Sequence, residues 1–210
     1  VCLTRGEVER AEAAFLKALE LDPNALGTYL ALGQIYAASG KYDQALEKVA
    51  QALKTNPKDL VSHMLSGTIY ERKGDVQKAL QAYEQALALN PQFAPAANNV
   101  AYFYSETGGD KEKALELAQR AKEAAPDEPH ISDTLGWILY KRGVYQRALS
   151  LLKESAAKLP DNPAVQYHLG MAYLKVGDRE GARKTLTQAV NSKVSFAGKE
   201  EAIRELAALK

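Results

Sequence analysis

The feature that most constrains this chain is a spacing of about 34 residues that recurs along it. Five prolines are separated by 34, 34, 35 and 34 residues, namely Pro23, Pro57, Pro91, Pro126 and Pro160. A fixed period of this size is typical of a helix–turn–helix array. Proline suits such a position because it cannot continue the preceding helix and is tolerated where the next one begins. The spacing therefore predicts an all-α solenoid of antiparallel helix pairs.

One unit of this pattern spans residues 26–59. It predicts two helices, Leu26–Ser39 and Tyr42–Lys54, joined at a glycine and followed by Asn56-Pro57. Each helix has its large or small apolar residues on one face at i, i+3, i+4 and i+7 spacings. A single helix pair is too small to bury two apolar faces, so each unit needs a copy of itself on either side.

The register divides the chain into repeats and two ends. Residues 1–25 form a leading partial repeat, and five repeats follow at 26–59, 60–93, 94–128, 129–162 and 163–196. The turn Gly108-Gly109 is one residue longer than the others and accounts for the spacing of 35. Residues 197–210 should form a capping helix near Lys199–Leu209, with one face against the last repeat and one in water.

Glycine recurs at one position of the first helix in four repeats: Gly33, Gly67, Gly136 and Gly170. A glycine inside a helix costs about 1 kcal/mol relative to alanine. Its recurrence at one position predicts that paired helices approach each other closely there.

Composition excludes several classes of function. Lys and Arg total 27 against 26 Asp and Glu, so no strong field of one sign attracts the chain to nucleic acid or an anionic membrane. Cys2 is the only cysteine, which excludes an internal disulfide and a multi-cysteine zinc site. We find no nucleophile elbow, phosphate-binding loop or HExxH motif, and we expect a non-enzymatic protein without a cofactor.

Two histidines on neighbouring repeats are the only candidates for a metal site. His130 and His168, with Asp133 nearby, have no recognised metal-ligand spacing, so we assign no metal. The first residues, Val1–Gly6, do not resemble a signal peptide, and no segment is long enough to span a membrane. The first repeat begins in its middle, so we expect a fragment without its native N-terminus. The compartment, bacterial cell envelope or cytoplasm, stays open.

With the period and these residues in place, the chain resembles the tetratricopeptide repeat (TPR) family over about residues 6–210. The family motif is met by Tyr29, Leu32, Gly33, Tyr36, Ala45, Val49, Ala52 and Pro57. The resemblance implies a right-handed superhelix whose first helices line a concave groove that binds proteins or peptides. Residues 133–143 and 159–170 also resemble the closing repeats of bacterial TPR lipoproteins of exosortase (PEP-CTERM) and exopolysaccharide systems.

In such a superhelix, residues one period apart become neighbours along the groove. The C-terminal repeats then bring aromatic, amide and other groups together: Asn98, Tyr102, Asp133, Trp137, Tyr140, Tyr167 and Met171. Aromatic side chains anchor a peptide by buried area, and Asn or Asp can bind its backbone. We predict a peptide groove centred on Trp137; the alternative is that Trp137, Tyr140 and Tyr167 only pack between adjacent helices.

The sequence thus predicts an adaptor that binds a protein or peptide partner. One alternative is a substrate-docking or regulatory arm of a larger enzyme, or of a secretion or polysaccharide export assembly. Another is a self-assembling scaffold, in which Phe15 and Leu19 of the leading half-repeat lack a covering helix and join two copies of the chain.

Overall fold

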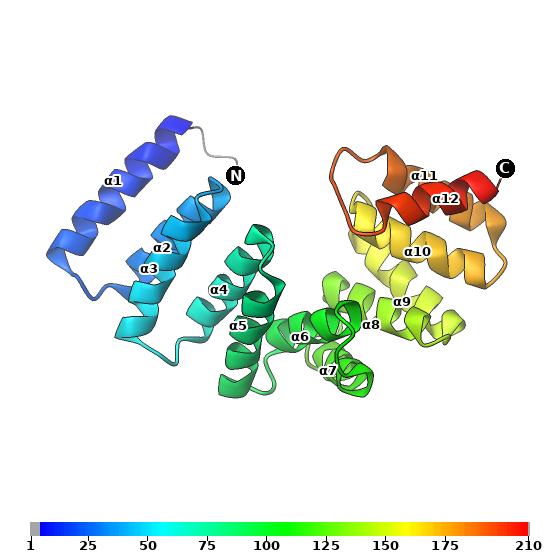
Figure 1. The fold of residues 1–210 in the computed structure, drawn as a ribbon, viewed down its shortest axis with the longest axis horizontal. Helices are drawn as coiled ribbons and strands as arrows, with labels where there is room; N and C mark the ends of the chain where they lie inside the picture. Colours follow the sequence, from blue (N-terminus) through cyan, green and yellow to red (C-terminus); the bar gives the residue numbers. More distant parts are fainter. Residues whose placement is uncertain (1–4, 210) are drawn as a thin grey trace. The chain divides into compact units, whose positions relative to one another are not determined.

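The computed structural model describes residues 5–209, with side chains from Val8 onward, and all regular secondary structure in this range is α-helical. Cys2 lies outside the described residues. The chain divides into two compact units, residues 1–96 and residues 97–210. Each unit is a stack of antiparallel helices, so the fold is the all-α solenoid predicted from the repeat (Figure 1).

Unit 1 contains a single helix followed by two helix pairs. Its elements are α1 (Arg5–Leu21), α2 (Leu26–Ala38), α3 (Tyr42–Thr55), α4 (Leu60–Lys73) and α5 (Val76–Leu89). The ends of α2 and α3 lie within one residue of the predicted ends. The members of each pair pack on each other, and α3 also packs on α4, as nearest-neighbour stacking requires (Figure 1).

The core of unit 1 corrects one prediction. Phe15 and Leu19 were expected to lack cover, but both are partly buried against the cluster that contains Leu32 and Tyr36. They are covered because α1 lies on α2, where the Tyr36 hydroxyl donates a hydrogen bond to Oε1 of Glu12 at 2.8 Å. The exposed large apolar residues of α1 are instead Leu16 and Leu21. Self-association through α1 stays an untested prediction.

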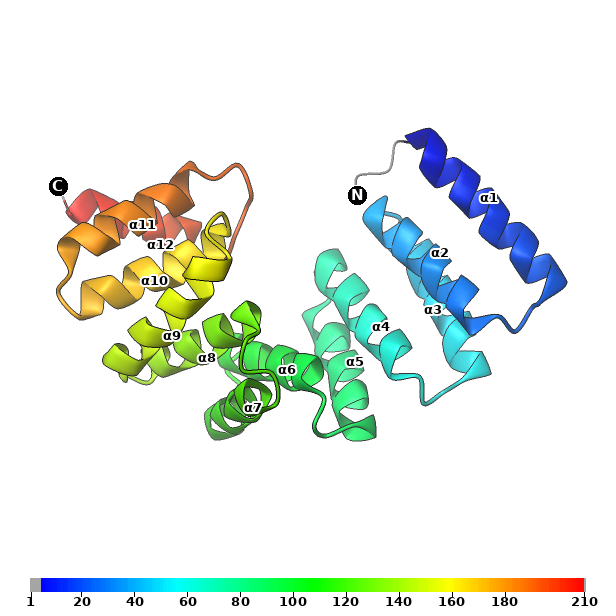
Figure 2. The same ribbon diagram turned by 180° about the vertical axis from the view of Figure 1, so that it is seen from behind.

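Unit 2 has seven helices among the described residues. They are α6 (Ala94–Glu106), whose first residues belong to unit 1, and then α7 (Lys111–Ala124), α8 (Pro129–Lys141), α9 (Tyr145–Lys158), α10 (Pro163–Lys175), α11 (Arg179–Asn191) and α12 (Lys199–Ala208). Successive helices from α7 to α11 pack on each other, and α12 packs on α11 and α10 (Figure 2). The repeat boundaries themselves stay a prediction.

The recurring glycines lie where paired helices approach closely. A Cβ added at Gly67 would lie 2.3 Å from Cε1 of Tyr83, and one at Gly170 would lie 2.6 Å from Cγ of Leu186. At Gly33 the nearest side-chain atom, Cγ2 of Val49, is 3.0 Å away. These distances confirm the predicted close approach, because carbon atoms in contact normally stay about 3.5–4.0 Å apart.

Local signals in the sequence set the ends of α4. The Asp59 carboxylate accepts a hydrogen bond from the backbone N–H of Ser62 at 2.7 Å, which satisfies a free donor at the start of the helix. At its other end Gly74 adopts φ +83°, and the N–H of Asp75 donates to the carbonyl of Tyr70 at 2.9 Å. No helix in the described part of the chain combines the length and the apolar character needed to cross a membrane.

Candidate functional site

The candidate surface lies in unit 2, on the first helices of three successive repeats, α6, α8 and α10. Contacts at about the repeat spacing join these helices. The indole N–H of Trp137 on α8 donates to Oε1 of Glu106 on α6 at 3.1 Å. Nδ1 of His168 on α10 lies 3.0 Å from each carboxylate oxygen of Asp133 on α8. Residues about one period apart therefore meet in space here, as the predicted groove requires.

Trp137 is the centre of an aromatic cluster. Its ring stacks with Tyr140, at a centroid distance of 4.7 Å and an interplanar angle of 5°, and with His168, at 4.1 Å and 18°. The ring of Tyr167 is tilted against it at 5.5 Å. Trp137 is 7% exposed and Tyr167 3%. Much of this aromatic surface is thus used for packing between helices, and only part of it faces solvent.

Lys141, one turn beyond Trp137 on α8, joins the same group. Its Nζ forms an ion pair with Oε1 of Glu106 at 2.6 Å and donates to the carbonyl of Ser105 at 3.2 Å. The ammonium also lies 5.6 Å from the Trp137 ring centroid, within reach of a cation–π interaction. Glu106 thus accepts hydrogen bonds from both Trp137 and Lys141, which fixes these side chains relative to α6.

The segment after the last repeat closes one end of the surface. Gly198 adopts φ +90°, and a Cβ there would lie 2.4 Å from Cε1 of Tyr167, so no other residue fits this approach without a shift. The Tyr167 hydroxyl donates to Oε2 of Glu201 at 2.6 Å. The N-terminal end of α12 is therefore held against α10.

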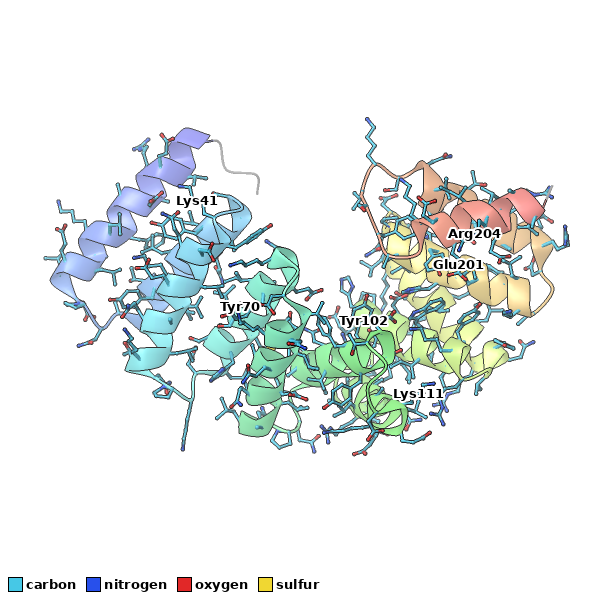
Figure 3. All side chains as sticks on the ribbon, in the orientation of Figure 1. Lys41, Tyr70, Tyr102, Lys111, Glu201 and Arg204 are labelled. Atoms are coloured by element: carbon cyan, nitrogen blue, oxygen red, sulfur yellow. The ribbon has the colours of Figure 1, made fainter. Side chains whose placement is uncertain are left out.

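A pocket of about 260 Å³ lies between these elements. Side chains from α6, α8, α10 and α12 and the backbone before α12 line it: Tyr102, Glu106, Trp137, Lys141, Tyr167, His168, Ala197, Gly198 and Glu201. Figure 3 labels two of these residues, Tyr102 on α6 and Glu201 on α12. The lining combines aromatic side chains with two carboxylates and one ammonium group.

The pKa values of two tyrosines in this region, Tyr140 and Tyr167, are raised above the ordinary value. Burial, followed by the neighbouring Glu201 carboxylate, raises the pKa of Tyr140 to about 12. The pKa of Tyr167 is raised further, first by burial and then by the hydrogen bond to Glu201. Both groups report an environment in which additional negative charge is disfavoured.

Three of the seven predicted groove residues line the pocket, namely Tyr102, Trp137 and Tyr167. Tyr140 stacks on Trp137 and Asp133 contacts His168, so both contact lining residues without lining the pocket themselves. Met171 is 4% exposed in the core cluster that contains Trp137 and Tyr167.

Asn98 lies apart from the pocket lining. It is 9% exposed, and its Oδ1 has no hydrogen-bond partner. Its Nδ2 donates to Oδ1 of the neighbouring Asn99 at 3.3 Å.

Six lining residues were not predicted from the sequence. Glu106 and Lys141 each lie four positions after a predicted residue, so helical spacing was the signal that could have found them. His168 directly follows Tyr167, and helical spacing does not place it on the same face. Ala197, Gly198 and Glu201 lie outside the repeats, where the period gives no register.

A metal at this surface has little support. His168 contacts Asp133, but within residues 5–209 no group of three or more His, Cys, Asp or Glu side chains is placed to hold an ion. Unit 1 has a separate pocket of about 340 Å³ between α3, α4 and α5, which Leu46, Leu53, His63, Tyr70 and Gln81 help to line.

Sequence models of one family match almost the whole chain. Models described as tetratricopeptide repeat match residues 1–25, 30–97, 72–138 and 139–196. A comparison with curated proteins gave no match.

Many solved structures share the fold. The structure of PilW, described as a widely conserved type IV pilus biogenesis factor, is 22% identical with a TM-score of 0.72, and the match covers 88% of this chain and 85% of PilW. YrrB, described as a TPR protein with an unusual peptide-binding site, is 20% identical with a TM-score of 0.64, covering 91% and 98%. A tetratricopeptide repeat protein from Parabacteroides merdae is 17% identical with a TM-score of 0.74, covering 97% and 80%.

Proposed function

The chain belongs to the tetratricopeptide repeat family, and from this we propose that it is a non-enzymatic scaffold whose unit 2 binds a segment of a partner protein over α6, α8 and α10. The observation that carries the proposal is the pocket beside Trp137, which three successive repeats and α12 build together. A site that spans several repeats suits an extended chain, because a peptide contacts several repeats in turn.

The size of the pocket favours a side chain of a larger ligand over a free small molecule. Its volume of about 260 Å³ is below the roughly 300–1,000 Å³ of pockets that enclose drug-sized ligands. A pocket of this size accepts one or two side chains, while the rest of the partner segment lies on the surrounding surface. Partly buried aromatic rings with polar groups beside them are typical of anchor positions in protein interfaces.

The structural neighbours support the same class of function. YrrB is described as having a peptide-binding site, and PilW as a factor in type IV pilus biogenesis. We propose that this chain likewise acts by holding a partner protein. The alternative, a docking arm of a larger enzyme or export assembly, is tested by the full-length reading frame, in which such an arm would continue into a different domain.

Selection from a random peptide library on the intact chain tests the proposal, with affinities of enriched peptides measured by titration calorimetry. Tyr102→Ala should weaken binding about tenfold or more, since a central aromatic anchor contributes on the order of 2 kcal/mol. The matched control is Tyr104→Ala, which removes the same residue type from the same helix but outside the pocket lining. Equal affinities for the two variants, with helicity retained, would contradict the proposal, as would failure of any peptide to bind.

A further inference from the structure

We infer that the pocket beside Trp137 receives a basic side chain of the partner, arginine in preference to lysine, with Glu201 as its counter-ion. This inference rests on the proposed function and specifies the chemistry of the segment that binds. Three observations carry it: the charge of the lining, the state of each charged group in it, and the shape of the walls.

The lining carries an excess of negative charge. Glu106 and Glu201 are carboxylates, Lys141 is the one ammonium group among the nine lining residues, and His168 lies against the carboxylate of Asp133. On α12, Glu205 lies one turn after Glu201, and both carboxylates act on the Tyr140 phenol. A cationic side chain entering the pocket therefore gains in electrostatic energy, whereas an acidic one is repelled.

The two carboxylates of the lining, Glu106 and Glu201, differ in whether a positive charge already lies beside them. Glu106 and Lys141 pair at 2.6 Å, and Lys141 has a second acceptor in the carbonyl of Ser105. Glu201 accepts from the Tyr167 hydroxyl at 2.6 Å, and it forms no ion pair with any described residue. A neutral donor leaves its full negative charge in place. Glu201 is thus a half-buried carboxylate at a pocket wall without a counter-ion.

An acidic partner group would have to share Lys141 with Glu106. The ammonium already donates to Glu106 and to the Ser105 carbonyl, so one N–H is left for a new acceptor, which would lie beside the Glu106 carboxylate. Two carboxylates that share one ammonium repel each other, and this repulsion lowers the gain from the new contact. A basic group meets no such repulsion, because Glu201 has lone pairs that remain unused.

The walls favour arginine over lysine. Tyr102 supplies partly exposed aromatic surface, Trp137 and Tyr167 add the small part of their rings that reaches the pocket, and Ala197 adds an apolar contact. The aliphatic part of a long side chain can pack on this surface. A guanidinium is planar, packs on aromatic rings and can bind a carboxylate through two parallel hydrogen bonds. An ammonium is more strongly hydrated and forms only a point contact.

A direct test uses N-acetyl-arginine amide as a probe in the millimolar range, with the intact chain. The chain has one tryptophan, so its ¹⁵N–¹H spectrum contains a single indole signal, from Trp137 beside the pocket. The arginine probe should shift this signal in a saturable manner and less strongly at high salt. The neutral isostere N-acetyl-citrulline amide and the acidic N-acetyl-glutamate amide should shift it far less.

Variants assign the effect to one carboxylate. Glu201→Gln keeps an oxygen that can accept from Tyr167 but removes the charge, and it should weaken the arginine probe about tenfold. Glu200→Gln removes the same charge from the neighbouring exposed position and should leave the affinity within about twofold. Tyr167→Phe removes the hydroxyl and retains the Glu201 charge, so it should keep the preference for arginine over citrulline.

The outcomes separate this inference from the proposed function. The inference would be overturned by equal shifts with the arginine and citrulline probes, or by equal affinities of Glu201→Gln and Glu200→Gln for the arginine probe. In that case, binding of library peptides without basic residues would still support the proposed function. Binding of the arginine probe by a chain that binds no peptide would refute the proposed function and leave the charge preference of the pocket intact.

Discussion

Replacing Gly67 by alanine tests the claim that glycine is required where paired helices approach. The added Cβ would lie 2.3 Å from Cε1 and 2.5 Å from Cδ1 of Tyr83, whose side chain is fully buried. Because carbon atoms in contact need about 3.5 Å, the ring must move by more than about 1 Å. The Tyr83 hydroxyl donates to Oε2 of Glu71 at 2.9 Å, and a movement of that size would break or lengthen this bond.

The expected loss of stability follows from three contributions. Overpacking a core site costs about 1–3 kcal/mol. Loss of a hydrogen bond to a charged group adds up to about 1.5–3 kcal/mol. The higher helix propensity of alanine returns about 1 kcal/mol. We therefore expect Gly67→Ala to lower the free energy of unfolding by about 3 kcal/mol, which in urea corresponds to a midpoint about 1.5 M lower.

The control is a glycine in a helix without a close neighbour. Gly27 lies in the first turn of α2, and a Cβ there would meet no atom within 4 Å. Gly27→Ala should leave stability unchanged or raise it by up to about 1 kcal/mol. Urea unfolding followed by circular dichroism measures both variants, and hydrogen exchange locates the loss in α4 and α5. If Gly67→Ala were as stable as Gly27→Ala, close packing would not explain the recurring glycine.

Three further predictions concern unit 2. Gly198→Ala should lower the free energy of unfolding in urea by about 3 kcal/mol, because the left-handed backbone is strained and the added Cβ would approach Tyr167. The control is Gly40→Ala in unit 1, at φ +72° with no atom within 4 Å, which should lose only the backbone strain of about 1–2 kcal/mol. The Lys122 ammonium donates to Glu154 at 2.5 Å and lowers the pKa of that carboxyl, so this pair should stabilise the fold above pH 4.5. The stability difference between wild type and Glu154→Gln, measured by thermal melts, should shrink as the pH falls through the pKa of Glu154 in the folded state. A constant difference down to pH 2 would contradict this. Burial raises the pKa of Tyr140 to about 12. The ultraviolet difference spectrum between wild type and Tyr140→Phe should therefore show no phenolate at pH 10.5 and a phenolate signal near pH 12. Ionisation near pH 10 would show that the ring is exposed.

The sequence predicted those parts of the fold that depend on neighbouring residues. The helices α2 and α3 were placed to within one residue, because apolar spacing, a turn glycine and a following proline all act locally. The close approach at Gly67 and Gly170 was predicted for a similar reason, because the same packing constraint in each repeat requires glycine at the same position. The partial burial of Phe15 and Leu19 was missed because the repeat pattern alone does not show that α1 packs on α2.

The candidate site was less accessible from the sequence. Periodicity predicts which helix face Trp137 occupies, but its depth is set by stacking with Tyr140 and His168, and that depends on side-chain geometry between helices. The position of Glu201 could not be predicted, since it depends on how the chain turns between Asn191 and Gly198, outside any repeat. The candidate pocket is therefore built partly from residues that the period does not describe.

The contribution of Ala197, Gly198 and Glu201 to the pocket has a consequence for protein engineering. A designer who grafts only the repeats onto another scaffold would transfer the aromatic lining residues but not Ala197, Gly198 and Glu201. Conversely, exchanging residues 192–209 for a different tail would alter what the pocket accepts without rewriting a single repeat. The lining of the candidate pocket is thus divided between the repeats and the segment that follows them.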